Sequence, residues 1–579
     1  MTAVSQVPAV LWLLAAPMTA ALITLIGKLL PGRWTALPAF LCWSGGTAWG
    51  LWQAAPAALA GSSLLYAFGG WEEPAGIVIE LNPVSWAAVL LVLLIGTAVW
   101  LASHRYGGIG SVFFLIFYLG LFALQGVLCS RDLFNLFIWF ELLSLSVFLL
   151  VGYDQTPAAM LAAFRYLLIS TVSILGFLVG LWILYAFCGT PSFSVIESCL
   201  AAVRAKGPVE GGLPPLHVIH NLRTTAAVIL IMTGMLTRSA VVPFHGWLPP
   251  AHSSAPYPAS ALLSGFVIKV PVFALWHFSD SLPQLPLTGL LLWIGVCSAI
   301  FGSIAAVFQM DAKKILAYSS IGHMGFIMSA FAAAGPHGKT AALLYISMHG
   351  LSKALLFLTV GLITSESGSR NVYLLRGAGR RFPAAALFYW IAALTLMGFP
   401  FSGGYYAKVA VTTTVSSPAA QWLLTAAGAA TDLALFKIGL IFFGRPPAYG
   451  GSGGRVPPKI SYPARSASLL GMGLLAAACA ALAFFPDRLL HLAESLAGNE
   501  TVPAGMVSTY FLVAAGKTSN LLKTSAAFLI GAAGLFIFRF QPVKTFSDRI
   551  SALRLGTDGT VRLLIIGILI FLVSGAFRI

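Results

Sequence analysis

The stretch Val242-Pro243-Phe244-His245-Gly246-Trp247-Leu248-Pro249-Pro250 interrupts one long apolar run, and Gly398–Gly404 (GFPFSGG) interrupts another. Proline removes a backbone donor and blocks the preceding helical turn, while glycine accepts the dihedral angles that result. In lipid, the freed carbonyl groups persist only where protein or water satisfies them. The two breaks fall at comparable places in two successive blocks, roughly 111–278 and 286–443, which is the pattern of an inverted repeat in a transporter.

The apolar runs around these breaks predict an all-α polytopic membrane protein. The chain has 579 residues, 59% of them hydrophobic and only 9% charged, and its mean hydropathy is +0.91. Runs of about 20 apolar residues, the length that crosses a bilayer, recur from end to end. We expect about 14 core spans and about two C-terminal spans. The expected spans are 8–30, 34–53, 84–103, 111–129, 132–152, 161–187, 225–244, 258–278, 286–308, 312–334, 340–364, 383–410, 418–443, 466–486, 521–540 and 561–578.

The order of spans predicts four segments, with breaks at the seventh and twelfth spans. Residues 1–110 would hold the N-terminal transmembrane helices, and 111–278 and 279–443 the two inverted five-helix repeats. Residues 444–579 would hold a linker and the C-terminal transmembrane helices. The linker is expected at Arg445–Gly454 because of its proline and glycine content, and residues 488–506 read as a polar connection.

The distribution of positive charge predicts an orientation in the membrane. Lys and Arg concentrate on the odd-numbered loops, whereas the acidic residues Glu72, Glu73 and Glu80 lie on an even-numbered loop. Positive-inside reasoning places the odd loops in the cytoplasm and the N-terminus outside, in a bacterial or archaeal cytoplasmic membrane. The first span runs on through Ile26 without a small-residue cleavage site, so we expect a retained helix.

Several function classes are disfavoured by composition. The net charge of +16 is spread over short loops rather than gathered in one segment, which argues against nucleic-acid binding. The six cysteines form no C-x-x-C pair and no grouping suited to zinc or an iron–sulfur cluster. There is neither a Walker-type phosphate loop nor a dinucleotide-binding glycine turn. We therefore expect no cofactor and no catalytic redox centre in this chain.

Five ionisable residues lie inside the expected spans, where a lipid-crossing helix should carry none. A charge at the bilayer centre costs at least about 2.5 kcal/mol on insertion scales, and such residues commonly line ion pathways. Glu141 lies nine residues beyond Asp132, which at 1.5 Å per residue places it about 13 Å into the bilayer. The five are Glu141, Lys269, His349, Lys353 and Lys408.

The spacing of the basic residues suggests a proton relay. His349 and Lys353 are four residues apart and share one helix face, so two proton carriers would lie one turn apart. His323 is either a further carrier or a core histidine. Each charged residue also has a purely structural interpretation. Glu141 could form an ion pair that locks two helices, and Lys269 could extend its ammonium group to the membrane interface. We expect Lys313 and Lys314 to be cytoplasmic anchors only.

Four stretches together resemble the antiporter-like membrane subunits. This family includes proton-pumping subunits of respiratory complex I, large subunits of Mrp cation/proton antiporters and matching subunits of membrane-bound hydrogenases. The similarity extends over about residues 110–410 and depends on the joint order of the motifs. The stretches are Asp132–Glu141, Pro243–Pro249 with Ala251-His252, Asp311–Ile321, and His349–Lys353.

The resemblance implies a role for each candidate residue. Glu141 would be the glutamate that controls, through its electric field, a lysine on the broken seventh helix. That position is Arg238 here, and a guanidinium does not deprotonate in proteins, so Arg238 would be a fixed charge. Lys269 would be the next carrier, His349 and Lys353 the central relay, and Lys408 the distal lysine.

The leading hypothesis is a proton-translocating subunit of a larger redox-driven complex, of the NADH:quinone oxidoreductase or hydrogenase type. A partner subunit would change the Glu141–Arg238 separation and so the field at Lys269. At an effective dielectric near 20, a unit charge about 10 Å from Lys269 changes the energy of the charged amine by roughly 1.7 kcal/mol. Expected partners are other membrane subunits, peripheral redox subunits and the lipid bilayer. Two alternatives stay open: a Mrp-type sodium/proton antiporter subunit, and a membrane scaffold that does not pump.

Overall fold

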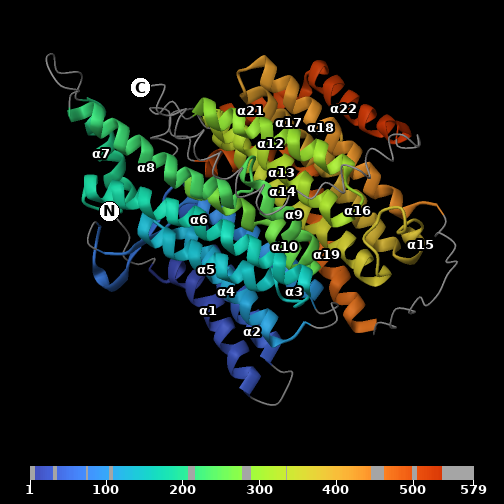
Figure 1. Ribbon diagram of the computed structural model, residues 1–579, viewed down its shortest axis with the longest axis horizontal. Helices are drawn as coiled ribbons and strands as arrows, with labels where there is room; N and C mark the ends of the chain where they lie inside the picture. The colour runs from blue at the N-terminus through green and yellow to red at the C-terminus, as the bar shows by residue number, and fades with distance from the viewer. Residues whose placement is uncertain are drawn as a thin grey trace.

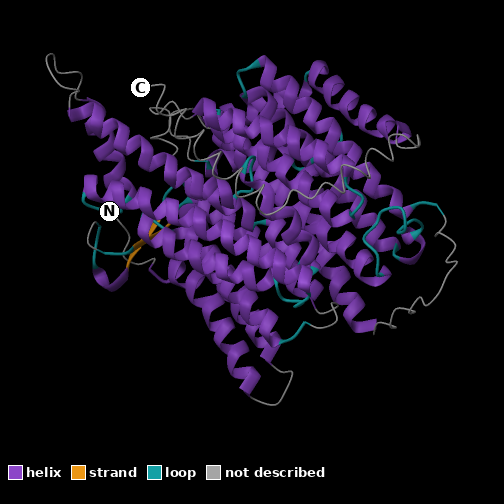
Figure 2. Cartoon of the chain, in the orientation of Figure 1, coloured by secondary structure: helices purple, strands orange, loops and turns teal. Residues whose placement is uncertain are grey.

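The computed structural model describes residues 7–29, 35–73, 76–103, 109–205, 216–276, 288–333, 336–444, 462–497 and 505–537. These residues are almost entirely helical, with one short β-hairpin (Figure 2). The elements are α1 (Val7–Leu29), α2 (Ala36–Leu59), β1 (Leu64–Ala67), the 3-10 helix η3 (Phe68–Gly70), β2 (Val78–Leu81), α3 (Pro83–Ser103), α4 (Ser111–Cys129), α5 (Leu133–Val151), α6 (Pro157–Cys188), α7 (Phe193–Ala205), α8 (Leu216–Arg238), η4 (Phe244–Trp247), α9 (Leu248–Ser254), α10 (Tyr257–Gly265), η5 (Val267–Lys269), α11 (Val270–Trp276), α12 (Thr288–Phe308), α13 (Ala312–Ala332), α14 (Pro336–Ser367), α15 (Ala378–Arg381), α16 (Pro383–Met397), α17 (Gly403–Thr414), α18 (Pro418–Gly439), η7 (Leu440–Phe442), α19 (Tyr462–Phe484), α20 (Pro486–Leu496), α21 (Met506–Gly516) and α22 (Thr518–Ile537).

The predicted membrane character is confirmed. Ten helices of the described residues are long and apolar enough to cross a membrane, or up to eleven if the pair Ser466–Ala481 and Pro486–Leu496, bent by 92°, is one span. The other expected spans within the described residues coincide with shorter, broken or less apolar helices. The expected linker Arg445–Gly454 and the last expected span, 561–578, lie outside the described residues.

Local sequence sets where several spans begin. Asp132 caps α5 by accepting a hydrogen bond from the Asn135 N–H at 2.6 Å, and Asp311 caps α13 through the N–H groups of Lys313 and Lys314. Ser417 precedes α18, which has proline at its first position. These side chains satisfy N–H groups that the first helical turn leaves without intrahelical partners.

The loops gather into two groups, one at each end of the helix bundle. The group that we call the hairpin face joins the α2–α3, α4–α5 and α6–α7 connections through the bridges Ile79 to Ser130 and Asp132 to Ser192. Arg131 reinforces it with hydrogen bonds to Glu73 and Glu80. Figure 2 shows the hairpin at the left edge of the molecule.

The group that we call the second face lies at the other end of the same helices. Gly110 N–H donates to the Tyr153 hydroxyl at 3.1 Å, which joins the α3–α4 and α5–α6 connections. A bridge from Asp311 to Asn371 and a bond from Gly377 N–H to the Phe443 carbonyl join the connections after α12, α14 and α18. Figure 1 shows α15 at the right of the molecule, opposite the hairpin. Among the described connections that these contacts join, the even-numbered ones lie on the hairpin face and the odd-numbered ones on the second face.

Helix breaks occur at both predicted places and at a third that the sequence analysis missed. After α8 ends at Arg238, the chain turns through η4 before α9 begins. A second break separates α16 from α17, where Gly398 has φ +73° and Phe401 φ +65°. The third lies at Phe266, with φ −137° and ψ −46°, between α10 and η5. The expected span 258–278 is present as Tyr257–Trp276, with this local interruption just before Lys269.

Helices α12 and α13 pack with their backbones close together. A Cβ atom on Gly302 would overlap the Gly322 nitrogen and would lie 2.7 Å from the Tyr318 carbonyl oxygen. These are backbone atoms of the facing helix, so a larger residue forces the two helices apart.

Gly302→Ala is expected to lower the thermal unfolding midpoint of the purified protein, at a cost of about 1–3 kcal/mol from overpacking. Gly289→Ala is the matched control, since Gly289 is in the same helix and a Cβ there meets nothing within 4 Å. Equal midpoints for the two variants would contradict close α12–α13 packing.

Candidate functional site

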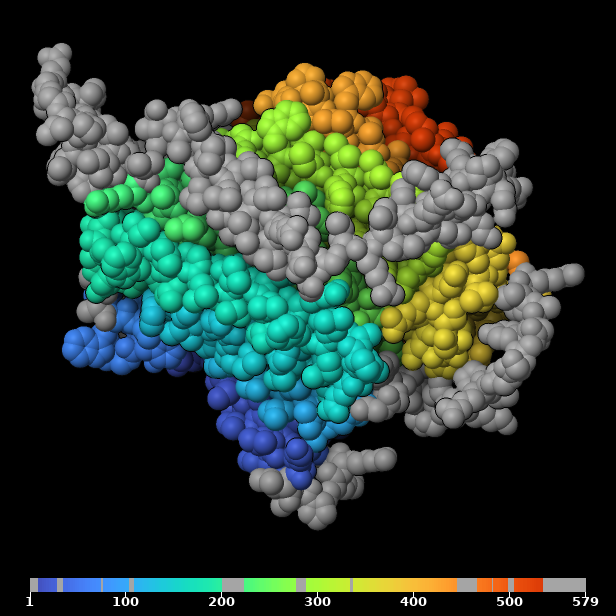
Figure 3. Space-filling model, viewed as in Figure 1, coloured from blue at the N-terminus to red at the C-terminus, as the bar shows by residue number. Residues whose placement is uncertain are grey.

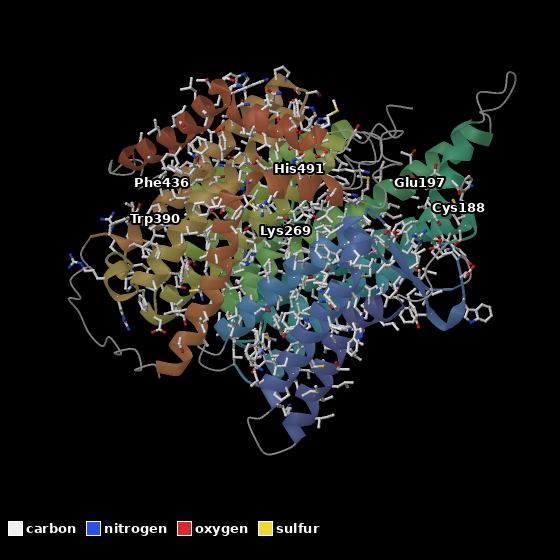
Figure 4. All side chains as sticks on the ribbon, turned by 180° about the vertical axis from the view of Figure 1, so that it is seen from behind. Cys188, Glu197, Lys269, Trp390, Phe436 and His491 are labelled. Carbon is white, nitrogen blue, oxygen red and sulfur yellow. The ribbon has the colours of Figure 1, made fainter. Side chains whose placement is uncertain are left out.

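The predicted ionisable residues differ sharply in burial. Lys269, His323, His349 and Lys353 are all 0% exposed, and Arg238 is 8% exposed. Figure 4 places Lys269 near the middle of the molecule. Ammonium groups this far from solvent are costly unless neighbouring dipoles or charges compensate them. The contacts of each residue therefore decide what it can do.

Glu141 and Arg238 form the expected ion pair, between α5 and the end of α8. Arg238 Nη2 lies 3.2 Å from Glu141 Oε1. Nη1 donates to the Phe140 carbonyl at 3.1 Å and to the Ser144 hydroxyl, and the guanidinium carbon lies 5.0 Å from the Phe140 ring centre. Arg238 is thus fixed against α5 by three kinds of contact, which suits a charge that does not titrate.

Glu141 is not buried within this chain. Its side chain is 44% exposed, whereas that of Arg238 is 7% exposed. Phe134, Ile138 and Leu145 on the same helix are also 44–50% exposed. Spacings of three and four residues place all of them on one face of α5. The carboxylate therefore lies on an apolar outer surface, and the ion pair joins that surface to the interior.

Lys269 lies at the third helix break and holds the carbonyl groups that the break frees. Its Nζ donates to the Gly265 carbonyl at 2.9 Å and to the Ser264 carbonyl. Both carbonyls belong to the last turn of α10, where the helix itself supplies no hydrogen-bond donor for them. The broken backbone thus supplies the dipoles that surround this buried amine.

Serine hydroxyl groups connect Lys269 to Lys353. Ser264 Oγ lies 2.8 Å from Ser320 Oγ, and Ser320 Oγ donates to the Leu316 carbonyl at 2.9 Å. Lys353 Nζ donates to the same carbonyl at 3.0 Å and to Ser319 Oγ at 2.5 Å. Lys269 meets this row at the Ser264 and Gly265 carbonyls, and Lys353 meets it at the Leu316 carbonyl and Ser319 Oγ. The serines of α10 and α13 therefore give the space between the two amines a polar lining of hydroxyl groups, which both donate and accept.

His323 and His349 stand face to face between α13 and α14. Their ring centres are 4.9 Å apart, and His323 Nδ1 lies 2.8 Å from the Tyr345 hydroxyl oxygen. His323 Nε2 and both His349 nitrogens have no protein hydrogen-bond partner among the described residues. Buried polar atoms without protein partners are commonly satisfied by ordered water. The predicted pair His349 and Lys353 is therefore joined by His323 from the neighbouring helix.

Lys408 has a counter-ion that the sequence analysis missed. Its Nζ lies 3.3 Å from Asp432 Oδ1 and donates to the Met397 carbonyl, the last residue of α16, at 2.5 Å. Asp432 is 1% exposed and lies in the middle of α18. A carboxylate deep inside an apolar span was the signal that selected Glu141. The same signal is present at Asp432, which lies in the expected span 418–443.

Two more buried basic residues were undervalued by the sequence analysis. Lys313, expected to be a cytoplasmic anchor only, is 6% exposed and donates to the Ala255 carbonyl at 2.8 Å, so it also contributes to helix packing. His252 is 0% exposed, neither ring nitrogen has a partner in the described part of the chain, and its ring centre lies 4.5 Å from that of Phe357. Burial of these side chains depends on helix packing, which residue spacing does not reveal.

The structure brings most, but not all, of the predicted residues together. The serine row joins Lys269 and Lys353, and His323 approaches His349. Glu141 and Arg238 form a separate pair, and their hydrogen bonds share no partner with those of Lys269. Among the described residues, no group of three or more His, Cys, Asp or Glu side chains could hold a metal ion.

The amino-acid sequence matches a family model described as "NADH:quinone oxidoreductase/Mrp antiporter, TM" over residues 130–433. It is 31% identical over 354 residues to NADH-quinone oxidoreductase subunit N of Desulforudis audaxviator, covering 59% of this chain and 67% of that protein. It is also 31% identical over 347 residues to the putative antiporter subunit mnhA2 of Staphylococcus haemolyticus. That match covers 55% of this chain and 40% of the relative, so the chain spans well under half of that relative's length.

Two solved structures share the fold. One is from the membrane-bound sulfane sulfur reductase, an archaeal respiratory membrane complex, with a TM-score of 0.73 and 22% identity over 88% of this chain and 99% of the other. The second is from the Mrp complex of Dietzia sp., with a TM-score of 0.74 and 20% identity over 89% and 100% of the two chains. Both similarities extend beyond the segment that the family model matches.

Proposed function

Because this chain belongs to the NADH:quinone oxidoreductase/Mrp antiporter transmembrane family, we propose that it is a proton-translocating subunit of a larger redox-driven membrane complex. The observation that carries the proposal is the row of buried groups from Lys269 through the serine hydroxyls to Lys353 and the two histidines. Buried amines and imidazoles exchange protons near neutrality more readily than exposed lysines do.

The relay begins at Lys269 and ends at Lys408. Protons move from Lys269 past the Ser264, Ser320 and Ser319 hydroxyl groups to Lys353, and then to His349 and His323. Water completes the links where the hydrogen bonds end on the Ser264 and Leu316 carbonyls, because a carbonyl has no proton to pass on. From His323, Tyr345 and water lead towards the Lys408–Asp432 pair. Tyr345 is hydrogen-bonded to His323, which supports the start of this last step.

Glu141 and Arg238 control the relay without carrying protons. Arg238 stays charged, so the field that it exerts on Lys269 depends on how closely Glu141 compensates it. A partner that draws Glu141 away leaves the charge of Arg238 uncompensated. At an effective dielectric near 20, a unit charge about 10 Å away raises the energy of the charged Lys269 amine by roughly 1.7 kcal/mol. Loading and unloading of Lys269 would follow the partner's movement.

A second membrane subunit covers the outer face of α5. An ionised carboxylate that is 44% exposed among apolar side chains is costly in lipid, and a polar group of a partner compensates it there. Other membrane subunits and peripheral redox subunits are therefore the proposed partners. The chain supplies the carriers, and the energy source lies in those partners.

The proposed architecture places 111–278 and 279–443 as two inverted repeats between the N-terminal helices of 1–110 and the C-terminal segment 444–579. The hairpin face, which carries Glu72, Glu73 and Glu80, lies outside a bacterial or archaeal cytoplasmic membrane together with the N-terminus. The second face lies inside. The carriers are the chain's own side chains, with no cofactor.

The second candidate is a component of a cation/proton antiporter. It is favoured by the similarity to the putative antiporter subunit of Staphylococcus haemolyticus and to a component of a probable K(+)/H(+) antiporter of Rhizobium meliloti, 31% identical over 398 residues. Proton flux that requires Na⁺ or K⁺ on the opposite side of the membrane would favour this candidate. Flux that requires an electron donor, independently of metal cations, favours the first. The third alternative, a scaffold that does not pump, predicts no proton flux that depends on a metal cation or on an electron donor.

Glu141→Gln is expected to lower coupled proton translocation roughly tenfold, because the substitution removes a charge worth roughly 1.7 kcal/mol at Lys269. The glutamine keeps the shape and one acceptor for Arg238, so the assembled complex should form normally. Proton uptake by inverted membrane vesicles, divided by electron-transfer rate or by cation flux, measures the effect.

The matched control is Glu72→Gln, which removes an exposed carboxylate of the hairpin face. It is expected to leave the ratio unchanged. An undiminished ratio in Glu141→Gln would eliminate the control role of the pair, whereas equal losses in both variants would point to a general effect of surface charge.

A further inference from the structure

Two cysteine side chains lie next to each other at the hairpin-face end of α6. Cys188 is the last residue of α6, and Cys199 lies on α7. Their thiol groups are within hydrogen-bonding range of each other, and both residues are half-buried. Figure 4 shows Cys188 beside Glu197 of α7, and Figure 3 shows the teal surface of this part of the chain at the left edge of the molecule. The two thiols are therefore neighbours at a place that solvent reaches.

The connection between the two helices keeps them close together. Gly189 ends α6 with φ +75°, and its N–H donates to the Tyr185 carbonyl at 2.8 Å. Glycine adopts this left-handed conformation without strain, which is why it commonly ends helices. Residues 189–192 alone connect α6 to α7, which begins at Phe193. So short a connection holds the end of α6 near the first two turns of α7.

Cys199 lies on the face of α7 that packs against the rest of the molecule. Phe193 and Ile196 are 7% and 1% exposed, whereas Ser194 and Glu197 are exposed. Residues three and four apart share one face of a helix, so Cys199, three residues after Ile196, lies on the buried face. Six residues at 1.5 Å per residue place it about 9 Å beyond Phe193 along α7. Its thiol thus faces the interior side, where α6 ends.

The chain around the two cysteines is already fixed to the hairpin face. Phe193 N–H donates to the Arg131 carbonyl at 3.2 Å. The hydroxyl groups of Ser192 and Ser194 donate to the Glu73 carboxylate at 3.0 and 2.8 Å. These contacts hold the connection and the first turn of α7. A covalent bond at Cys199 would therefore join two positions that the fold has brought together, and would fix α7 beyond its first turn.

The other four cysteines have different surroundings. Cys42 and Cys479 each contact a hydroxyl group, at 3.0 and 3.7 Å. Cys129 is fully buried at the end of α4, and Cys297 is exposed on α12, an apolar helix long enough to cross a membrane. These residues serve as internal controls for any oxidation that occurs during purification.

We propose that Cys188 and Cys199 form a disulfide bond that anchors α7 to α6 on the hairpin face. On the proposed orientation this face lies outside the cytoplasm, where disulfide bonds form and persist. One thiolate attacks the disulfide of an extracytoplasmic dithiol–disulfide oxidoreductase to give a mixed disulfide, and the other thiolate then displaces that enzyme. The two cysteines together give up two protons and two electrons, which reduce the oxidoreductase to its dithiol form.

The test is mass spectrometry of the assembled complex, isolated from cells whose thiols are blocked with N-ethylmaleimide before lysis. Glu197 lies between the two cysteines in the sequence, so a glutamate-specific protease places them on separate peptides. The peptides are compared before and after reduction. A deuterated maleimide added after reduction then marks every sulfur atom that had been in a disulfide bond.

The expected result is a linked pair of peptides, one ending at Glu197 and one beginning at Ser198, that separates on reduction. Cys188 and Cys199 should carry the deuterated label, and the other four cysteines the first label. The first label on Cys188 and Cys199 in the assembled complex would overturn the proposal. A linkage of either residue to a different cysteine would overturn it as well.

Single substitutions confirm the pairing. Cys188→Ser is expected to leave Cys199 as a free thiol that takes the first label, and Cys199→Ser gives the reciprocal result if the first variant does not assemble. Cys297→Ser is the matched control, and it should leave the linked peptides unchanged. A deuterated label that persists on Cys199 in Cys188→Ser would contradict the pairing.

A membrane-impermeant maleimide applied to intact cells separates the bond from the proposed orientation. It should label Cys199 in Cys188→Ser and not in the unmodified chain. Linked peptides without labelling from outside would support the disulfide bond and contradict the orientation. Proton translocation does not pass through these cysteines, so free thiols in an active complex would overturn the disulfide bond alone.

Discussion

Lys353→Met is expected to lower proton translocation about a hundredfold or more while the complex still assembles. The loss follows from removal of the central proton carrier, since positioned acid–base groups typically contribute factors of about 10²–10⁴. Lys353 donates to the Leu316 carbonyl and to Ser319 Oγ. Assembly should persist without it because Ser319 Oγ itself donates to the Leu316 carbonyl at 3.1 Å, so neither group loses its last hydrogen bond. Replacing a buried charge with an apolar group of similar volume is often neutral or stabilising.

Lys437→Met is the matched control for that experiment. Lys437 is a second buried lysine, 2% exposed, and donates to the Val307 and Gln309 carbonyls at 2.9 and 2.7 Å, at the second-face end of α12. Translocation per assembled complex should stay within about twofold of the unmodified chain, well below the factors expected for a proton carrier. Proton uptake by inverted vesicles and the thermal midpoint of the purified complex are measured for both variants. Equal loss in both, or full activity in Lys353→Met, would contradict a relay through Lys353.

Asp432→Asn is expected to have the second large effect, on both stability and translocation. Asp432 is 1% exposed, and its Oδ1 lies 3.3 Å from Lys408 Nζ. Removing one partner of a buried pair leaves the other charge uncompensated, at a cost of about 3–5 kcal/mol. The uncompensated positive charge of Lys408 also repels a proton that arrives along the relay. Translocation should fall about a hundredfold.

The double variant Lys408→Met, Asp432→Asn separates the two effects. With both charges removed, the thermal midpoint should return most of the way to that of the unmodified complex, while translocation stays low. A double-mutant cycle on the unfolding free energies gives the coupling of the pair. Additive free energies would contradict a coupled pair. Recovery of translocation in the double variant would show that Lys408 carries no proton.

The positions of the helices could be predicted from the sequence because the determinants are local. A bilayer fixes the length of an apolar span, and the polar caps Asp132 and Asp311 mark where two of the spans begin. The breaks at Val242–Pro250 and Gly398–Gly404 could be predicted because proline and glycine change the backbone where they stand.

The third break was not predicted because no proline or glycine cluster marks it. Gly265 and Pro271 are isolated residues in an otherwise regular apolar run, and Pro271 disturbs the turn before it, where the interruption lies. Lys269 satisfies two carbonyls at the bend, those of Ser264 and Gly265. A contact between a side chain and a freed carbonyl depends on local packing that hydropathy does not describe.

The sequence by itself determined the membrane character, most of the spans and the cost of each charge inside them, because hydropathy and residue type are properties of single segments. Only the tertiary structure decided which charges meet. Asp432 faces Lys408, Glu141 stays on an outer surface, and Lys313 is buried against the end of α9. Each of these outcomes depends on which helix faces which, and that relation is fixed by packing between segments far apart in the chain.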